Sequence, residues 1–185
     1  MRWLIDPIDG TTNYLYGHPG FAVSIACERH GETLVGVVND PLHGDVFEST
    51  KGGGARRNGE PIAVTTNSDL ASALVATGFG YDAGHRRAQA EVVAKVIGSI
   101  RDIRRMGAAA VDLCSVACGR VDAYYERGLN SWDLAAGSLI AEEAGARLGA
   151  IGGGAPMPGS ILAASPAIFD ELQALLVEAG AVEHD

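Results

Sequence analysis

Two carboxylates, Asp6 and Asp9, lie three residues apart around a proline near the start of the chain, and Gly10 and Thr11 follow at once. The apolar run at residues 3–5 predicts a short buried strand in front of them. Carboxylates at the end of such a strand are costly to bury without a cation. Hard oxygen ligands suit Mg²⁺ or Ca²⁺ better than zinc, so this spacing indicates a metal site.

The residues that follow the two carboxylates favour phosphate binding. Gly10 lets the backbone approach an anion closely, and the next amides can bind phosphate if a helix begins near Thr11. Carboxylates beside such amides are typical of metal-assisted phosphoryl chemistry. A capped turn explains the same residues, because Asp-Pro and Asp-Gly pairs are common in turns.

Two carboxylates further along the chain, those of Asp133 and Glu126, can each be explained without a functional role when considered alone. Asp133 lies at the start of a predicted helix, where the helix dipole favours an ionised carboxylate and where it can simply cap the helix. Glu126 ends a predicted strand beside Arg127, as a solvated strand end would.

Four motifs in order resemble the inositol monophosphatase family, and together they span nearly the whole chain: residues 6–13, 107–113, 122–126 and 132–137. The resemblance implies a Mg²⁺-dependent, lithium-sensitive phosphatase. It also implies a set of metal ligands, namely the carboxylates of Asp6, Asp9 and Asp133 and the backbone carbonyl of Ile8.

The resemblance further implies roles in catalysis and substrate binding. Asp9 and Thr11 would be catalytic, with the Thr11 hydroxyl orienting the attacking water. The amides of Gly10 and Thr11 would hold the phosphate, the backbone at Ala109 would lie against the inositol ring, and Glu126 would contact a substrate hydroxyl. An N-cap is the alternative role for Thr11, and both roles can hold at once.

One departure from the family pattern affects the expected activity. Members normally carry a substantial segment before the first motif, which supplies a glutamate metal ligand and an acidic partner for Thr11. These groups are absent from this sequence, so we expect the 185-residue chain as written to be a poor enzyme and one face of its first sheet to lack a cover.

The pattern of elements predicts an α/β (α+β) layered sandwich in two halves. Residues 1–67 form an antiparallel half, with strands at 3–5, 21–27, 33–38, 45–49 and 61–64. In residues 68–185, predicted strands at 73–77, 100–104, 121–126 and 160–164 alternate with helices at 85–97, 108–118 and 132–144 and a last helix from Pro166. Ser131 is the predicted cap of the third helix. The resemblance implies alternating helix and sheet layers of the inositol monophosphatase type, N-terminally truncated, as one compact unit with the site between the halves.

Composition limits the class of partner. A formal net charge of −9 argues against direct nucleic-acid binding, and no apolar run approaches the roughly 20 residues of a membrane span. Three cysteines, Cys27, Cys114 and Cys118, give no disulfide framework, which favours a cytoplasmic location. The expected partners are a small phosphorylated polyol and a second copy of the chain in a homodimer.

We therefore expect a Mg²⁺-dependent phosphomonoesterase that hydrolyses inositol monophosphate or a similar polyol phosphate. One alternative keeps the site and changes the substrate to histidinol phosphate, a sugar bisphosphate or a 3′-phosphonucleotide. Another is a shortened, inactive member that acts as a binding or regulatory protein.

Overall fold

A six-stranded antiparallel sheet is built from consecutive strands in the order in which they occur, β1-β2-β3-β4-β5-β6. The computed structural model describes residues 1–182. Each strand pairs with the next; the connections after β2 are short, as the antiparallel arrangement permits, whereas the segment between β1 and β2 contains a short helix. The strands are β1 (Arg2–Asp9), β2 (Ala22–Arg29), β3 (Glu32–Asp40), β4 (Asp45–Thr50), β5 (Ala55–Arg57) and β6 (Glu60–Pro61).

A second, mixed sheet has five strands in the order β10-β11-β9-β7-β8. β7 pairs in parallel with β8 and β9, whereas β11 pairs antiparallel with β9 and β10. The strands are β7 (Leu74–Thr77), β8 (Asp102–Arg104), β9 (Ala123–Glu126), β10 (Arg147–Gly149) and β11 (Ile161–Ala164). The first sheet ends before residue 67 and the second begins after residue 68, but the division into two halves there stays a prediction.

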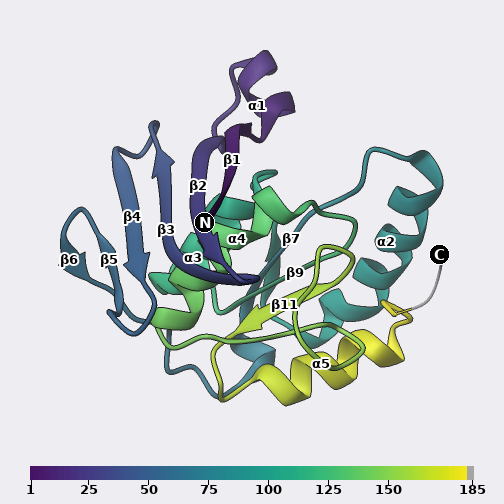
Figure 1. Cartoon of the computed structure of the whole chain (residues 1–185). Helices are drawn as coiled ribbons and strands as arrows, with labels where there is room; N and C mark the ends of the chain where they lie inside the picture. Colours follow the sequence, from purple (N-terminus) through teal and green to yellow (C-terminus); the bar gives the residue numbers. More distant parts are fainter. Residues whose placement is uncertain (183–185) are drawn as a thin grey trace.

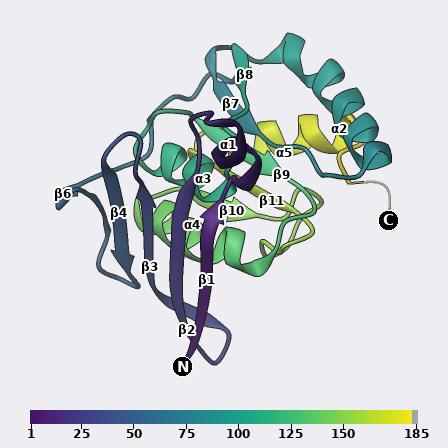
Figure 2. The same ribbon diagram turned by 90° about the horizontal axis from the view of Figure 1, so that it is seen from above.

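The helices form layers between and beyond the two sheets. α3 (Ala109–Ala117) and α4 (Ser131–Glu143) lie between the sheets and contact both. α2 (Ala83–Val96) and α5 (Phe169–Glu178) cover the other face of the second sheet, as Figures 1 and 2 show from two directions. The short α1 (Thr11–Tyr16) projects beyond the end of the first sheet (Figure 1). The layered sandwich predicted from the sequence is therefore confirmed.

The buried strand predicted at residues 3–5 is a strand, but it is buried on one face only. Leu4 faces α4, whereas Trp3 is 62% and Ile5 54% exposed. An antiparallel sheet with helices on one side sends alternate side chains outward, and none of the described helices lies against the outer face of the first sheet. Val35 and Val46 are also exposed there, so the expected uncovered face is present in the described residues.

Several predicted element boundaries are wrong for local reasons. The strand expected at 61–64 ends at Pro61, and the chain then leaves the sheet so that the Val64 amide donates to the Ala144 carbonyl. Asn130, not Ser131, is the N-cap of α4. The last helix begins at Phe169 rather than at Pro166, because a turn closed by the Ile168 amide and the Ser165 carbonyl comes first. β10 was not predicted.

The cysteines and the helices agree with the composition. All three cysteines are free thiols, two buried and one partly buried. No helix among residues 1–182 is both long and apolar enough to cross a bilayer. The cytoplasmic location stays a prediction.

Candidate active site

The end of β1 carries the first two carboxylates of the site. The pairing of β1 with β2 shifts between Asp6 and Asp9, so the strand bulges where they lie. The Ile8 amide donates to the Asp6 carboxylate at 3.0 Å, which fixes the side chain against its own backbone. A bulge re-aims side chains at a strand end, and here it accompanies two carboxylates that turn toward the same place.

Gly10 turns the chain from β1 into α1. Its φ is 81°, which an L-residue rarely adopts, and an added Cβ would lie 2.5 Å from the Gly20 carbonyl oxygen. Gly10 is the N-cap of α1 and Thr11 is its first helical residue, so the alternative role of Thr11 as the N-cap is wrong. The Thr11 hydroxyl instead donates to the Ile8 carbonyl at 2.9 Å.

Asn13 anchors this turn to a distant part of the chain. Its buried side-chain amide donates to the Gly20 carbonyl at 2.7 Å and to the Met106 carbonyl at 2.6 Å. The segment that leads into α3 is thereby tied to the segment that carries Thr11. Asn13 belongs to the motif at residues 6–13, but the sequence predicted no role for its side chain.

Asp133 comes to the site at the first turn of α4. Its Oδ2 accepts the Asn130 backbone amide at 2.6 Å, so the capping interpretation is correct. The capping bond uses one carboxylate oxygen and leaves the other available, because an ionised carboxylate has about four lone-pair positions. Capping and ligation are therefore compatible.

The three aspartates converge. Asp6, Asp9 and Asp133 each offer one carboxylate oxygen, and these oxygens lie within 4.8 Å of one another. Asp9 and Asp133 are buried and Asp6 is partly buried. Three carboxylates this close, most of them away from water, repel one another unless protons or a cation intervene. The spacing fits a divalent cation with oxygen ligands, and the role of the three as metal ligands stays a prediction.

The electrostatics of the cluster follow from burial and like charge. Burial raises the pKa of Asp9 to about 7, with Asp133, Asp6 and Glu126 adding to the rise and the Ala110 amide opposing it. Burial also raises the pKa of Asp6, and its neighbour Asp133 raises it further. Both carboxyl groups therefore bind protons more tightly than a free aspartate does, and protons compete with a cation for the metal-free cluster.

α3 presents its N-terminus to the same cluster. The Ala110 amide donates to Asp9 Oδ2 at 2.8 Å, although the two residues are 101 positions apart. Ala109, the predicted contact of the substrate ring, is the first residue of α3 and is buried. The structure thus places Ala109 one residue from a direct partner of Asp9, and its contact with substrate stays a prediction.

Glu126 is not the solvated strand end that its sequence position allowed. Burial raises its pKa to about 7, and the Tyr124 hydroxyl, which opposes the rise, donates to Glu126 Oε2 at 2.7 Å. The charge of Asp133 also raises the pKa of Glu126, so the two carboxylates feel one another across the site. Gly78 packs directly beneath, since an added Cβ there would collide with the Glu126 carboxylate.

Asp112 is a buried carboxyl group that sequence reasoning missed as a site residue. It is 1% exposed, and neither oxygen has a hydrogen-bond partner among the described residues. Burial raises its pKa well above the ordinary value, with Glu126 and Asp9 contributing and Arg105 opposing. Its place inside the apolar helix α3 was a signal, because a carboxylate among buried apolar residues is costly without a function or a partner.

This arrangement can do a specific kind of chemistry. Three convergent carboxylates can hold a hard cation, and an exposed threonine hydroxyl lies beside them. A partly buried glutamate nearby can accept hydrogen bonds from an alcohol. These groups, brought together where strand and helix ends meet, are of the kind that metal-assisted phosphoryl chemistry uses.

Comparison with known proteins places the chain more closely. The model of the inositol monophosphatase family matches residues 1–181. The inositol-1-monophosphatase SuhB of Mycobacterium tuberculosis is 46% identical over 183 residues, covering 95% of this chain and 62% of the relative. The Nus factor SuhB of Escherichia coli is 41% identical, covering 94% of this chain and 66% of the relative.

Solved structures agree with this assignment. The structure of inositol monophosphatase from Anabaena superposes with a TM-score of 0.90 at 41% identity, covering 95% of this chain and 74% of that one. The chain therefore belongs to the inositol monophosphatase family. It spans about 62% of the length of the mycobacterial relative that it matches.

Proposed function

We propose that the chain carries the catalytic core of a Mg²⁺-dependent phosphomonoesterase that hydrolyses inositol monophosphate or a similar polyol phosphate. The observation that carries the proposal is the convergence of three carboxylate oxygens within 4.8 Å. Family membership supports it, because relatives are named inositol-1-monophosphatase. Bound Mg²⁺ would supply an acidified water and charge neutralisation at the phosphoryl group.

The chain's own residues would position the reactants. Asp6, Asp9, Asp133 and the Ile8 carbonyl would hold the cations, since the carbonyl keeps a lone pair beyond its bond from Thr11. Thr11 donates to that carbonyl, so the remaining lone pairs of its hydroxyl can accept a hydrogen bond from a water and orient it. The Gly10 and Thr11 amides would hold phosphate oxygens.

The leaving alcohol would be recognised on the opposite wall. Glu126, at the end of β9, would accept hydrogen bonds from a hydroxyl of the polyol. The Tyr124 hydroxyl already occupies one of its oxygens, which fixes the side chain and leaves the other oxygen for substrate. The backbone at Ala109 would lie against the polyol ring.

The test is release of phosphate from inositol 1-phosphate, measured with and without Mg²⁺, by the chain and by two asparagine variants. Asp133→Asn removes charge from the cluster and should lower turnover by about 100-fold or more, roughly 3 kcal/mol in barrier. Asp170→Asn changes an exposed aspartate of α5 that pairs with Arg147, and should leave turnover unchanged. Equal activity in the two variants would contradict the proposal.

A binding role is the second candidate, and a named relative favours it. The Escherichia coli relative is named a Nus factor, so a member of this family can carry a function other than phosphate release. In this case the chain would fold and bind its partner without turnover. Phosphatase activity that is absent at every Mg²⁺ concentration, with the fold intact by circular dichroism, would favour it.

We also propose a homodimer, supported by the apolar side chains that α1 exposes. Tyr14, Leu15 and Tyr16 are 52%, 75% and 85% exposed on a helix that projects from the molecule. A second copy of the chain would cover them. Light scattering should give twice the chain mass, and Leu15→Asp should give the mass of one chain. A single-chain mass for the unmodified protein would contradict the dimer.

A further inference from the structure

Asp112 is a buried carboxyl group beside the candidate active site, and the proposed function does not use it. It lies in the first turn of α3 and is 1% exposed. Neither of its oxygens has a hydrogen-bond partner among the described residues. A buried polar group without a partner destabilises the fold, so this carboxyl group calls for a role.

The position of Asp112 on α3 directs its side chain toward the site. Side chains on an α-helix point back toward its N-terminus, and the N-terminus of α3 donates the Ala110 amide to Asp9 Oδ2 at 2.8 Å. Burial raises the pKa of Asp112, and the charges of Glu126 and Asp9 raise it further. Asp112 therefore shares one corner of the site with these two carboxyl groups.

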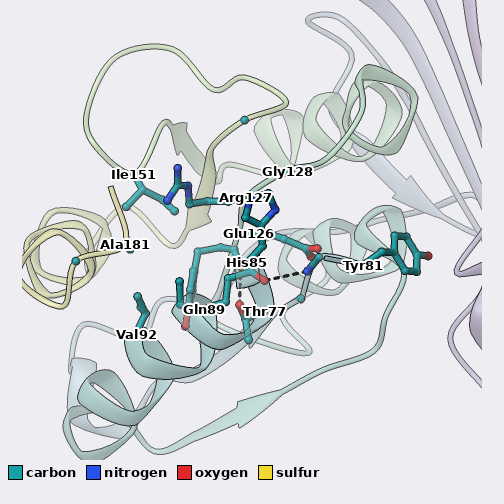
Figure 3. Close-up of a pocket in the computed structure, with 16 residues that line it drawn as sticks. Thr77, Tyr81, His85, Gln89, Val92, Glu126, Arg127, Gly128, Ile151 and Ala181 are labelled. Carbon is teal, nitrogen blue, oxygen red and sulfur yellow. Dashed lines mark hydrogen bonds between the residues drawn. The ribbon is translucent and has the colours of Figure 1, made fainter. Parts of the chain in front are cut away.

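Tyr124 belongs to the same corner. Its side chain is completely buried, and its hydroxyl donates to Glu126 Oε2 at 2.7 Å. Burial raises the pKa of Tyr124, and the charges of Glu126 and Asp112 raise it further. Glu126 also lines a cavity of about 400 Å³, as Figure 3 shows, whereas Tyr124 and Asp112 do not. Tyr124 thus supports Glu126 from the protein interior.

A count of donors decides which form of Asp112 can bond to these neighbours. The one hydroxyl proton of Tyr124 is already donated to Glu126, and an ionised Glu126 can only accept. An ionised Asp112 would only accept as well, so it could bond to neither. An uncharged Asp112 has one O–H group to donate, and both the Tyr124 oxygen and the Glu126 carboxylate can accept it.

Arg105 is the cation that could instead pair with an ionised Asp112. Its guanidinium lies against Gly107, because an added Cβ there would collide with it. Its charge opposes the rise in the pKa of Asp112 that burial causes. However, Arg105 is exposed and its charge is screened by water, and it makes no hydrogen bond to the Asp112 oxygens. Burial and the two neighbouring carboxylates therefore favour the uncharged form.

We propose that Asp112 is a positioning residue, which stays uncharged and donates a hydrogen bond to the Tyr124–Glu126 pair. This bond fixes Glu126 in the orientation that contacts the polyol, because a supporting hydrogen bond restricts the rotamer of the group that touches substrate. The inference rests on the proposed function for the contact between Glu126 and substrate. Asp112 does not touch substrate itself, so it affects KM more than kcat.

Two substitutions separate a hydrogen-bonding role from a role of charge. Asp112→Asn keeps the shape and a donor without a charge, whereas Asp112→Leu keeps the bulk and removes both polar atoms. With inositol 1-phosphate, Asp112→Leu should raise KM about fivefold at an unchanged Mg²⁺ affinity, and Asp112→Asn should restore KM to within about twofold. Ser115→Ala is the control, because it removes a hydroxyl of the same helix that donates to the Val111 carbonyl.

A phosphoester without a polyol distinguishes the positioning of Glu126 from general damage to the site. 4-Nitrophenyl phosphate offers no hydroxyl to Glu126, so its KM should be the same in Asp112→Leu as in the unmodified chain. An equal rise of KM for both esters would show that Asp112 supports the fold alone. A loss of Mg²⁺ affinity in Asp112→Asn would show that Asp112 acts through its charge. Either result would overturn the inference.

Infrared difference spectroscopy tests the uncharged form without any turnover. At pH 8, above the pKa values of about 7 of Asp9 and Glu126, the unmodified chain should show the C=O stretch of a protonated carboxylic acid that Asp112→Asn lacks. This band in a chain that hydrolyses no phosphoester would uphold the uncharged Asp112 and contradict the proposed function. Hydrolysis of inositol 1-phosphate without the band and without the KM difference would do the reverse.

Discussion

At the scale of single residues, the site depends on side chains that serve two purposes. Asp133 caps α4 through Asn130 and still directs an oxygen to the aspartate cluster. Thr11 donates to the Ile8 carbonyl and remains open to solvent. Such double use lets the fold position each group rigidly, because the structural bond restricts the rotamer that the chemistry needs.

Replacing Asp9 with asparagine should separate the chemistry from the fold. The side-chain carbonyl of the introduced asparagine can still accept the Ala110 amide, and the lost charge relieves repulsion in the cluster, so the free energy of unfolding of the metal-free chain should not fall. The lost charge should lower kcat by about 100-fold or more. Phosphate release and urea unfolding measure the two effects. A large loss of stability with kcat retained would contradict the assignment.

The residues of the site show how much sequence can and cannot predict. The motifs around Asp6 and Asp133 identified the carboxylates, but no spacing rule predicts that residues 127 positions apart meet within 4.8 Å. Only the packing of α4 against β1 and β2 brings them together. Asp112 was missed because its burial depends on how α3 packs between α4 and the two sheets, which the local sequence does not show.

At the scale of elements, close packing of α4 on the first sheet sets the position of Asp133. Gly36 of β3 permits this approach, because an added Cβ would lie 2.8 Å from the Ala136 carbonyl oxygen and 3.0 Å from its Cα. The sequence predicted both elements but not their contact. The local sequence of one segment predicts whether that segment forms a helix or a strand. A close contact between two backbones depends on both segments, so neither sequence predicts it alone.

Gly36→Ala should therefore push α4 away from β3. The clash is with backbone, which cannot move aside cheaply, so the free energy of unfolding should fall by about 1–3 kcal/mol. Since α4 carries Asp133, affinity for Mg²⁺ should fall too. Gly98→Ala is the matched control, because nothing lies within 4 Å of the added Cβ there. Equal stability of the two variants in urea would contradict this view of the packing.

At the scale of the whole molecule, the outer face of the first sheet stands out. Burial at residues 3–5 was predicted from three apolar residues in a row, which is a sound inference for a strand covered on both faces. The described helices cover only one face, so Trp3 and Ile5 contact solvent. Local hydrophobicity could not show which face would be covered.

An exposed apolar sheet face favours association between molecules. Ile5→Thr should raise the highest soluble concentration of the chain while changing the free energy of unfolding by less than about 0.5 kcal/mol, since Ile5 is 54% exposed. Leu4→Thr, one residue away but buried, should cost about 2 kcal/mol or more. Solubility that does not rise in Ile5→Thr would show that this face does not drive association.

Stability should depend on pH in a direction set by the buried acids. Asp9 and Glu126 have pKa values of about 7 in the folded chain, raised from 3.8 and 4.5 mainly by burial. A carboxyl group whose pKa is raised by folding binds its proton more tightly in the folded state. The stabilisation of the folded state that this proton binding provides is therefore complete below about pH 4. It is lost as the pH rises toward 7, and it is absent at higher pH.

The metal-free chain should accordingly be more stable at pH 5 than at pH 8, with a loss of roughly 3 kcal/mol for one such group. Mg²⁺ favours the ionised carboxylates and should raise the melting temperature more at pH 8 than at pH 5, because fewer protons must leave at pH 8. Differential scanning calorimetry with EDTA or Mg²⁺ at both pH values measures this. Asp133→Asn should abolish the Mg²⁺ effect and Asp170→Asn should keep it. A Mg²⁺ shift of equal size at the two pH values would show that the buried carboxyl groups do not exchange protons for the metal.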